Sequence, residues 1–172
     1  MFGVVHMSEC LSKAEEVYLY IIKHAQSNPN FGKTLFYKML YFSDFDFYEL
    51  FEKSITGSQY RKIDNGPAPC DFDRIIHSLK SKKFIQEVHV SSGNIKQIRY
   101  LLTREPKFSI MSSDEFAQIK RNIMRLEGMT ASQVSAYSHE DMPYKATKMK
   151  ELIDYNLVHY RNPQFSASAK ND

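Results

Sequence analysis

The chain of 172 residues carries 23 basic and 20 acidic side chains, and 42% of its residues are hydrophobic. This composition is typical of a globular protein long enough to bury a core, and it excludes a chain that is disordered throughout. The net charge of +3 is too small to imply a polyanionic partner.

Targeting signals are not evident in the sequence. No stretch approaches the roughly 18 apolar residues of a membrane span, and the apolar start is too short for a signal peptide. Cys10 and Cys70 lack metal-ligand spacing and suit a reducing compartment. We therefore expect a cytoplasmic protein without a membrane partner, with one domain at residues 1–165 and a flexible tail at 166–172. The sequence leaves open whether Met1 or Met7 is the native start.

The first predicted helix begins after Ser12, which forms a capping-box pattern with Glu15. It should end near Gln26, before a Ser-Asn-Pro-Asn segment. A second helix is predicted from Lys33 to Phe51, where apolar and aromatic residues cover most of the circumference. This second helix should be the centre of the core.

Three tyrosines and a carboxylate share one face of the central helix, at Tyr37, Tyr41, Asp44 and Tyr48. Such a face fits either the rim of a core or a surface that binds a partner. Asp46 lies only two residues from Asp44, so the two carboxylates point in different directions and cannot form a catalytic or metal-binding pair.

Asp46 instead falls near the buried side of the helix, where an unpaired charge is costly. The sequence therefore predicts a structural ion pair for Asp46, with Arg61, Lys62 or Lys145 as the expected partner. The following segment, residues 64–69, contains Asn65, Gly66, Pro67 and Pro69, which predict a rigid turn before the next helix.

The middle of the chain has the layout of a winged helix. An amphipathic helix is predicted over Asp71–Lys83, and two alternating segments at 86–90 and 97–103 flank a hairpin signal at 91–94. Residues 71–107 hold 8 basic and 4 acidic side chains, which raises DNA binding as a rival function. Asp71 and Asp73 would repel phosphates at the start of this helix, so a solvated basic face is the preferred interpretation.

The last third of the chain is predicted to be helical again. Ser112 with Glu115 and Thr130 with Gln133 form two further capping-box patterns. A final helix is expected from about Lys150 to Arg161, with three side chains facing inward, Ile153, Leu157 and Tyr160. These elements predict a mainly helical α+β domain with a compact helical core, a central aromatic-rich helix and a small winged-helix-like β-hairpin.

His139, Glu140 and Asp141 form the most enzyme-like cluster in the sequence. Three consecutive side chains diverge, so they cannot hold one metal ion together. We expect a structural polar cluster, whose members are Asp46, Arg61, His139, Glu140, Asp141 and Lys145. Cys70 lies at a predicted helix start, but no base can be assigned to it, so we interpret it as a structural cysteine.

Two stretches resemble a known family. The first comprises LYFSDFD at 40–46, SITG at 54–57, Tyr60 and GPAP at 66–69, and the second is SHEDMPYKAT at 138–147. Together they resemble the Panacea domain family, also called SocA-like or GepA-like. Ala68 stands where a valine is usual in this family, and Tyr144 stands where a tryptophan is common. Both changes keep an apolar contact.

The resemblance implies a bacterial or prophage-encoded antitoxin that neutralises a partner toxin by direct binding, without cofactor, metal or catalytic residues. An antirepressor role fits the same resemblance. Because both stretches belong to one family signature, we expect them to meet in space and to form a partner-binding groove. The predicted groove residues are Tyr37, Tyr41, Asp44, Tyr48, Gly66, Pro67, Pro69 and Tyr144. The partner's identity and the oligomeric state stay open.

Overall fold

The computed structural model describes residues 10–170. Both candidate starts, Met1 and Met7, lie outside the described residues. The elements in chain order are α1 Lys13–Ala25, α2 Lys33–Phe51, β1 Tyr60–Ile63, β2 Gly66–Pro69, α3 Phe72–Ser81, β3 Ile85–Ser92, β4 Ile95–Leu102, α4 Ser113–Leu126, α5 Ala131–His139, α6 Met142–Lys145 and the 3₁₀ helices η2 Tyr155–Tyr160 and η3 Ser168–Lys170. The mainly helical α+β class is confirmed.

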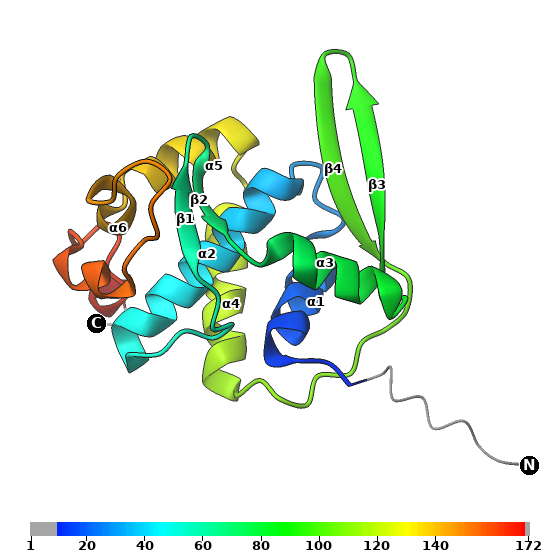
Figure 1. Ribbon diagram of the computed structural model, residues 1–172, viewed down its shortest axis with the longest axis horizontal. Coiled ribbons are helices and arrows are strands. Elements are labelled where there is room, and N and C mark those ends of the chain that lie inside the picture. Colours follow the sequence, from blue (N-terminus) through cyan, green and yellow to red (C-terminus); the bar gives the residue numbers. More distant parts are fainter. Residues whose placement is uncertain (1–9, 171–172) are drawn as a thin grey trace, which may run out of the picture.

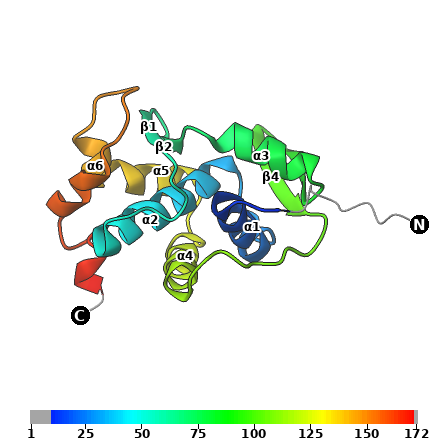
Figure 2. The same ribbon diagram turned by 60° about the horizontal axis from the view of Figure 1, so that its bottom comes forward.

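Helix α2 is the centre of the molecule, with the predicted bounds. Every residue from Lys38 to Phe47 is buried, which is the pattern of a helix enclosed on all sides. Figure 2 shows α4 on one side of α2 and the β1–β2 hairpin on the opposite side. Most of the other described elements therefore contact α2 and pack around it.

Local capping signals determine where three of the helices begin. Ser12, Ser112 and Thr130 each accept a hydrogen bond from the backbone three residues on, and the side chain at that position returns the contact. These reciprocal bonds satisfy amide groups that the first helical turn leaves unpaired. The three predicted capping boxes are confirmed.

Two separate antiparallel hairpins complete the fold. The β3–β4 hairpin follows α3, as the winged-helix layout predicts, and projects from the body in Figure 1. Its base is fixed by buried Ile85 and Tyr100, whereas residues 89–96 are all exposed. The β1–β2 hairpin was not predicted, because residues 64–69 were interpreted as a turn alone; Asp64 and Asn65 form the turn and Gly66–Pro69 pairs with Tyr60–Ile63.

The C-terminal region differs from the predicted helix over 150–161. Lys150 has a φ of 70°, and the backbone from Lys150 to Ile153 bonds to strand β1, so only Tyr155–Tyr160 coils, as a 3₁₀ helix. Tyr160 is 71% exposed rather than inward. Within the expected flexible tail, Ser166 and Ser168 are bonded to Glu49 of α2, so this described part is packed on the domain.

The described helices include none with the length and apolar content needed to cross a membrane.

Candidate functional site

The tyrosine face of α2 is mostly interior. Tyr41 and Asp44 are 0% exposed, so in this structure neither side chain reaches the partner surface predicted for it. The Asp44 carboxylate accepts hydrogen bonds from Tyr60, from the Thr56 hydroxyl and from the backbone amides of Ile55 and Thr56. Burial raises the pKa of Asp44, while these four donors act in the opposite direction. Asp44 therefore anchors the loop after α2.

The two signature segments meet in space, as predicted, but they pack instead of forming an open groove. Tyr144 of α6 donates a hydrogen bond from its hydroxyl to the carbonyl oxygen of Ile63 at 2.7 Å. The Lys62 ammonium lies 4.3 Å from the Tyr144 ring centroid and donates to the Tyr144 carbonyl oxygen. Tyr144 is only 5% exposed.

Strand β2 is equally enclosed. Gly66, Pro67 and Pro69 are buried, so in this structure they do not lie on the partner surface predicted for them. Strand β2 covers Lys38 of α2, which is fully buried. The Lys38 ammonium donates a hydrogen bond to the Pro67 carbonyl oxygen at 3.3 Å. The signature residues of β2 thus contribute to the packed interior of the domain.

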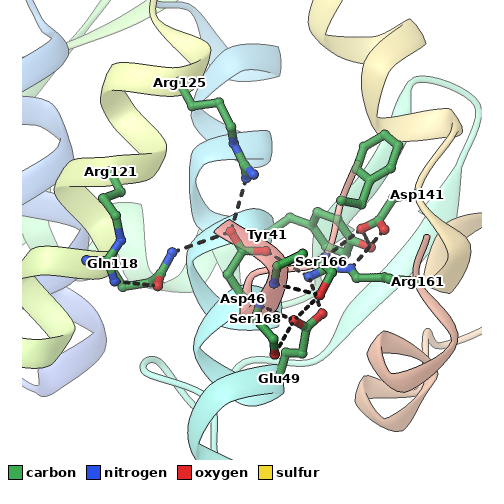
Figure 3. A network of polar contacts seen from close by, with 12 residues as sticks. Tyr41, Asp46, Glu49, Gln118, Arg121, Arg125, Asp141, Arg161, Ser166 and Ser168 are labelled. Carbon is green, nitrogen blue, oxygen red and sulfur yellow. Dashed lines mark hydrogen bonds and ion pairs between the residues drawn. The ribbon is translucent and has the colours of Figure 1, made fainter. Parts of the chain in front are cut away.

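The predicted polar cluster contains two buried carboxylates joined by an arginine that the sequence did not indicate. Arg161 has a side chain that is 0% exposed; it forms a two-point contact with Asp141, at 2.9 and 2.7 Å. Its third nitrogen donates to Asp46 at 2.8 Å and lies 3.5 Å from Glu49 (Figure 3). Burial opposes the charge of Arg161, yet Asp46 and Asp141 raise its pKa.

Asp46 is therefore in a structural ion pair, as predicted, but with different partners. Arg125 of α4 contacts its second oxygen at 3.1 Å, and Arg161 contacts the first. Arg61 is exposed and donates to the Lys150 carbonyl oxygen, which leaves it outside this network. No sequence spacing connects Arg161 with Asp46, because 115 residues separate them.

The remaining members of the predicted cluster lie apart from Arg161. His139 stacks on Tyr144, with ring centroids 4.7 Å apart and an angle of 3° between the planes. Glu140 is exposed and pairs with Lys145 at 3.5 Å. The three consecutive residues diverge, as predicted, and the described part of the chain contains no group of three side chains suited to a metal ion.

Two tyrosines of the predicted partner surface keep solvent exposure, Tyr37 and Tyr48. Tyr48 lines a groove of about 360 Å³, which we call the C-terminal groove. Its lining residues are Tyr48, Gln59, Leu152, Ile153, Asp154, Tyr155 and Asn156. The Tyr48 hydroxyl donates to the Asn156 side chain at 2.8 Å, and Leu152 is 44% exposed.

Most of the basic side chains in the winged-helix-like region have intramolecular partners. Arg99 donates to the carbonyl oxygens of Gln26, Asn28 and Pro29, and the Arg104 guanidinium lies 3.7 Å from the Phe84 ring centroid. Ion pairs join Arg74 to Asp71, Lys80 to Glu87 and Lys82 to Glu15. This supports the interpretation of these residues as structural and solvated, not as a DNA-binding face.

Comparison with known families gives one match. The family model described as "Antitoxin SocA-like, Panacea domain" matches residues 36–145, which is more than half of the chain. The matched range runs from within α2 to the end of α6, and it includes the first segment of the resemblance in full and residues 138–145 of the second. Curated proteins and solved structures gave no match.

Proposed function

Because the chain belongs to the SocA-like antitoxin family with a Panacea domain, we propose that it neutralises a partner toxin by direct protein-protein binding. The family match over residues 36–145 is the observation that carries this proposal. In this proposal the protein is not an enzyme and needs no cofactor. In this proposal it acts in the bacterial cytoplasm and is encoded by a bacterial or prophage gene.

The contacts of the enzyme-like residues favour binding over turnover. Asp141 is held by Arg161 and Tyr41, both in the core. His139 stacks on Tyr144, and Glu140 pairs at the surface with Lys145. Each side chain thus has a structural contact, and no two of them converge on a common point where a substrate would react.

In this proposal the toxin docks at the C-terminal groove. Eight large apolar side chains are exposed among the described residues, and three of them come from residues 149–160, namely Met149, Leu152 and Tyr160. Of these three, Leu152 lines the groove together with Tyr48 and Tyr155, and exposed apolar and aromatic side chains are typical of protein interfaces. Residues 149–160 also lie outside the matched range, so this surface can differ between proteins that share the same domain.

Co-expression tests both the function and the surface. The product of the adjacent open reading frame is expressed with and without this chain, and growth and co-purification are measured. We expect the wild-type chain to restore growth and to co-purify with that product. Leu152→Asp should abolish both while melting like the wild type, because it puts a charge into an apolar contact.

Met124→Asp is the matched control, since Met124 is an apolar side chain of α4 with 63% exposure. It should restore growth normally. Binding that persists in Leu152→Asp but fails in Ile95→Asp, at the tip of the β3–β4 hairpin, would reject the groove and keep the antitoxin function. A neighbouring product that is neither toxic nor bound would reject the function itself.

The winged-helix-like α3–β3–β4 arrangement supports a second candidate, a DNA-binding regulator or antirepressor. Electrophoretic mobility shifts at physiological salt distinguish the candidates. An antitoxin should show only weak, salt-sensitive binding without sequence preference. Submicromolar binding to one defined sequence would favour the regulator, and a repressor encoded nearby that binds the chain would favour the antirepressor.

A further inference from the structure

A pocket of about 240 Å³ opens between α4 and the C-terminal segment, and we call it the α4 pocket. Arg121, Asn122 and Arg125 line it from α4, and Lys170 lines it from η3. Figure 3 shows Arg125 of α4 reaching toward Asp46 of α2, and Arg121 one turn earlier, where it donates a hydrogen bond to the Gln118 side chain. Three cationic side chains from two distant parts of the sequence therefore border one small volume.

The described residues that line the α4 pocket carry more positive than negative charge. Asp46 is the one carboxylate among the described lining residues, and both of its oxygens are already engaged. One oxygen accepts from Arg161 at 2.8 Å, and the other accepts from Arg125 at 3.1 Å. Arg121 and Lys170 thus add positive charge to a pocket whose only acid is shared by two arginines.

Two buried donors in the same pocket have no acceptor. Asn122 is 2% exposed, and its side-chain amide nitrogen has no hydrogen-bond partner. The Nε of Arg125 is also buried without a partner. Both groups can only donate, and buried donors are almost always satisfied in folded proteins. A bound group with several acceptor oxygens would satisfy both.

Lys170 is a cation beside other cations. Burial lowers its pKa, and the nearby Arg125 and Arg161 lower it further, while Asp46 and Asp141 act in the opposite direction. An anion in the pocket would oppose both effects, because it stabilises the charged ammonium. The guanidinium groups supply planar pairs of donors that match the oxygens of phosphate.

We propose that the α4 pocket binds a phosphate-type oxyanion, either free phosphate or the phosphoryl group of a small metabolite. Arg121, Arg125 and Lys170 supply the charge, and Asn122 supplies a neutral donor. The site lies between α4 and the C-terminal segment, so the bound anion would join the two.

Binding is measured on the full chain with inorganic phosphate, by titration calorimetry and by ³¹P resonance, at constant ionic strength. We expect saturable binding. Arg121→Gln and Lys170→Gln should each weaken it by roughly tenfold, as the loss of a charge-assisted hydrogen bond predicts. Lys120→Gln is the matched control, because Lys120 is an exposed lysine of α4 that does not line the pocket, and it should leave the affinity unchanged.

Asn122→Leu separates binding from folding. Leucine removes the unpaired donor and has the same number and branching of side-chain heavy atoms, so this variant should melt no lower than the wild type and yet bind phosphate more weakly. A phosphomonoester of a small alcohol is the second probe: tighter binding than inorganic phosphate indicates a metabolite, and weaker binding indicates the free ion. The proposal is overturned if wild type shows no saturable phosphate binding, if acetate binds equally well, or if the pocket variants bind as tightly as Lys120→Gln.

Discussion

Lys38 is a buried cation whose nearest partner is a neutral carbonyl group. Its side chain is enclosed by α2, β2 and α5, and among the described residues no carboxylate forms an ion pair with it. Burial lowers the pKa of Lys38 from 10.5 to about 7. A group with this environment makes the stability of the protein depend on pH.

We predict that Lys38→Met stabilises the protein near pH 7 and that this gain shrinks as the pH rises. Between pH 7 and 10.5 the unfolded chain binds more protons at Lys38 than the folded one, so the wild type becomes more stable as the pH increases. Each unit of the pKa difference corresponds to about 1.4 kcal/mol, so a gain of a few kcal/mol is expected at pH 6–7. Urea unfolding at pH 6, 8 and 10 measures it, and a gain that is constant with pH would contradict this origin.

At the scale of one element, the β1–β2 hairpin depends on a glycine. Gly66 has a φ of +109°, and a Cβ atom there would lie 2.5 Å from the Ser138 hydroxyl oxygen and 2.6 Å from Lys38 Cε. Both the backbone angle and the space therefore exclude a side chain. The close approach lets β2 cover Lys38.

We predict that Gly66→Ala lowers the free energy of unfolding by about 2–4 kcal/mol, from the positive φ and the overpacking together. Two glycines serve as controls. Gly57 has a φ of +74° with open space around it, so Gly57→Ala should lower the free energy of unfolding only through the strained backbone angle. Gly128 has open space and no positive φ, so Gly128→Ala should be neutral or slightly stabilising. Equal melting temperatures for all three variants would refute the packing argument.

The elements that could be predicted from the sequence are those with local signals. Three helix starts could be predicted because each has a capping box within four residues, at Ser12, Ser112 and Thr130. The dense apolar pattern predicts α2. The β1–β2 strands were missed because each has four residues and two of the eight are prolines. The helix expected at 150–161 was wrong because backbone bonding to β1 overrides local periodicity there.

The site was predicted less well for a related reason. Helical periodicity correctly placed Tyr41 and Asp44 on one face, but it does not tell which faces of a fully enclosed helix reach solvent. The ionic role of Asp46 was predicted from its position on the apolar side of the helix, which the local sequence gives. Its partner Arg161 could not be predicted, because only the tertiary fold brings these two residues together.

At the scale of the whole molecule, Arg161 connects three carboxylates from parts of the chain that are far apart in the sequence. It joins α2 through Asp46 and Glu49 to the loop before α6 through Asp141, from a segment near the C-terminal end of the described chain. Removing it would leave three buried carboxylates without their common counter-charge, although Asp46 would keep Arg125.

We predict that Arg161→Ala lowers the free energy of unfolding by about 3–5 kcal/mol, the loss typical of one partner removed from a buried ion pair. Arg61→Ala is the control, because Arg61 is exposed, and it should change stability by less than about 1 kcal/mol. Chemical denaturation monitored by circular dichroism gives both values. A small effect of Arg161→Ala would mean that the carboxylates are neutralised in another way.

The long separation between Asp46 and Arg161 has a consequence for synthesis of the protein. The ribosome makes α2, with Asp46 and Glu49 on it, 115 and 112 residues before it makes Arg161. At about 5–20 residues per second, the nascent chain waits on the order of ten seconds for that counter-charge. During this interval the central helix cannot bury its acidic side chains at low cost, so the domain should complete its folding only after most of the chain has been translated.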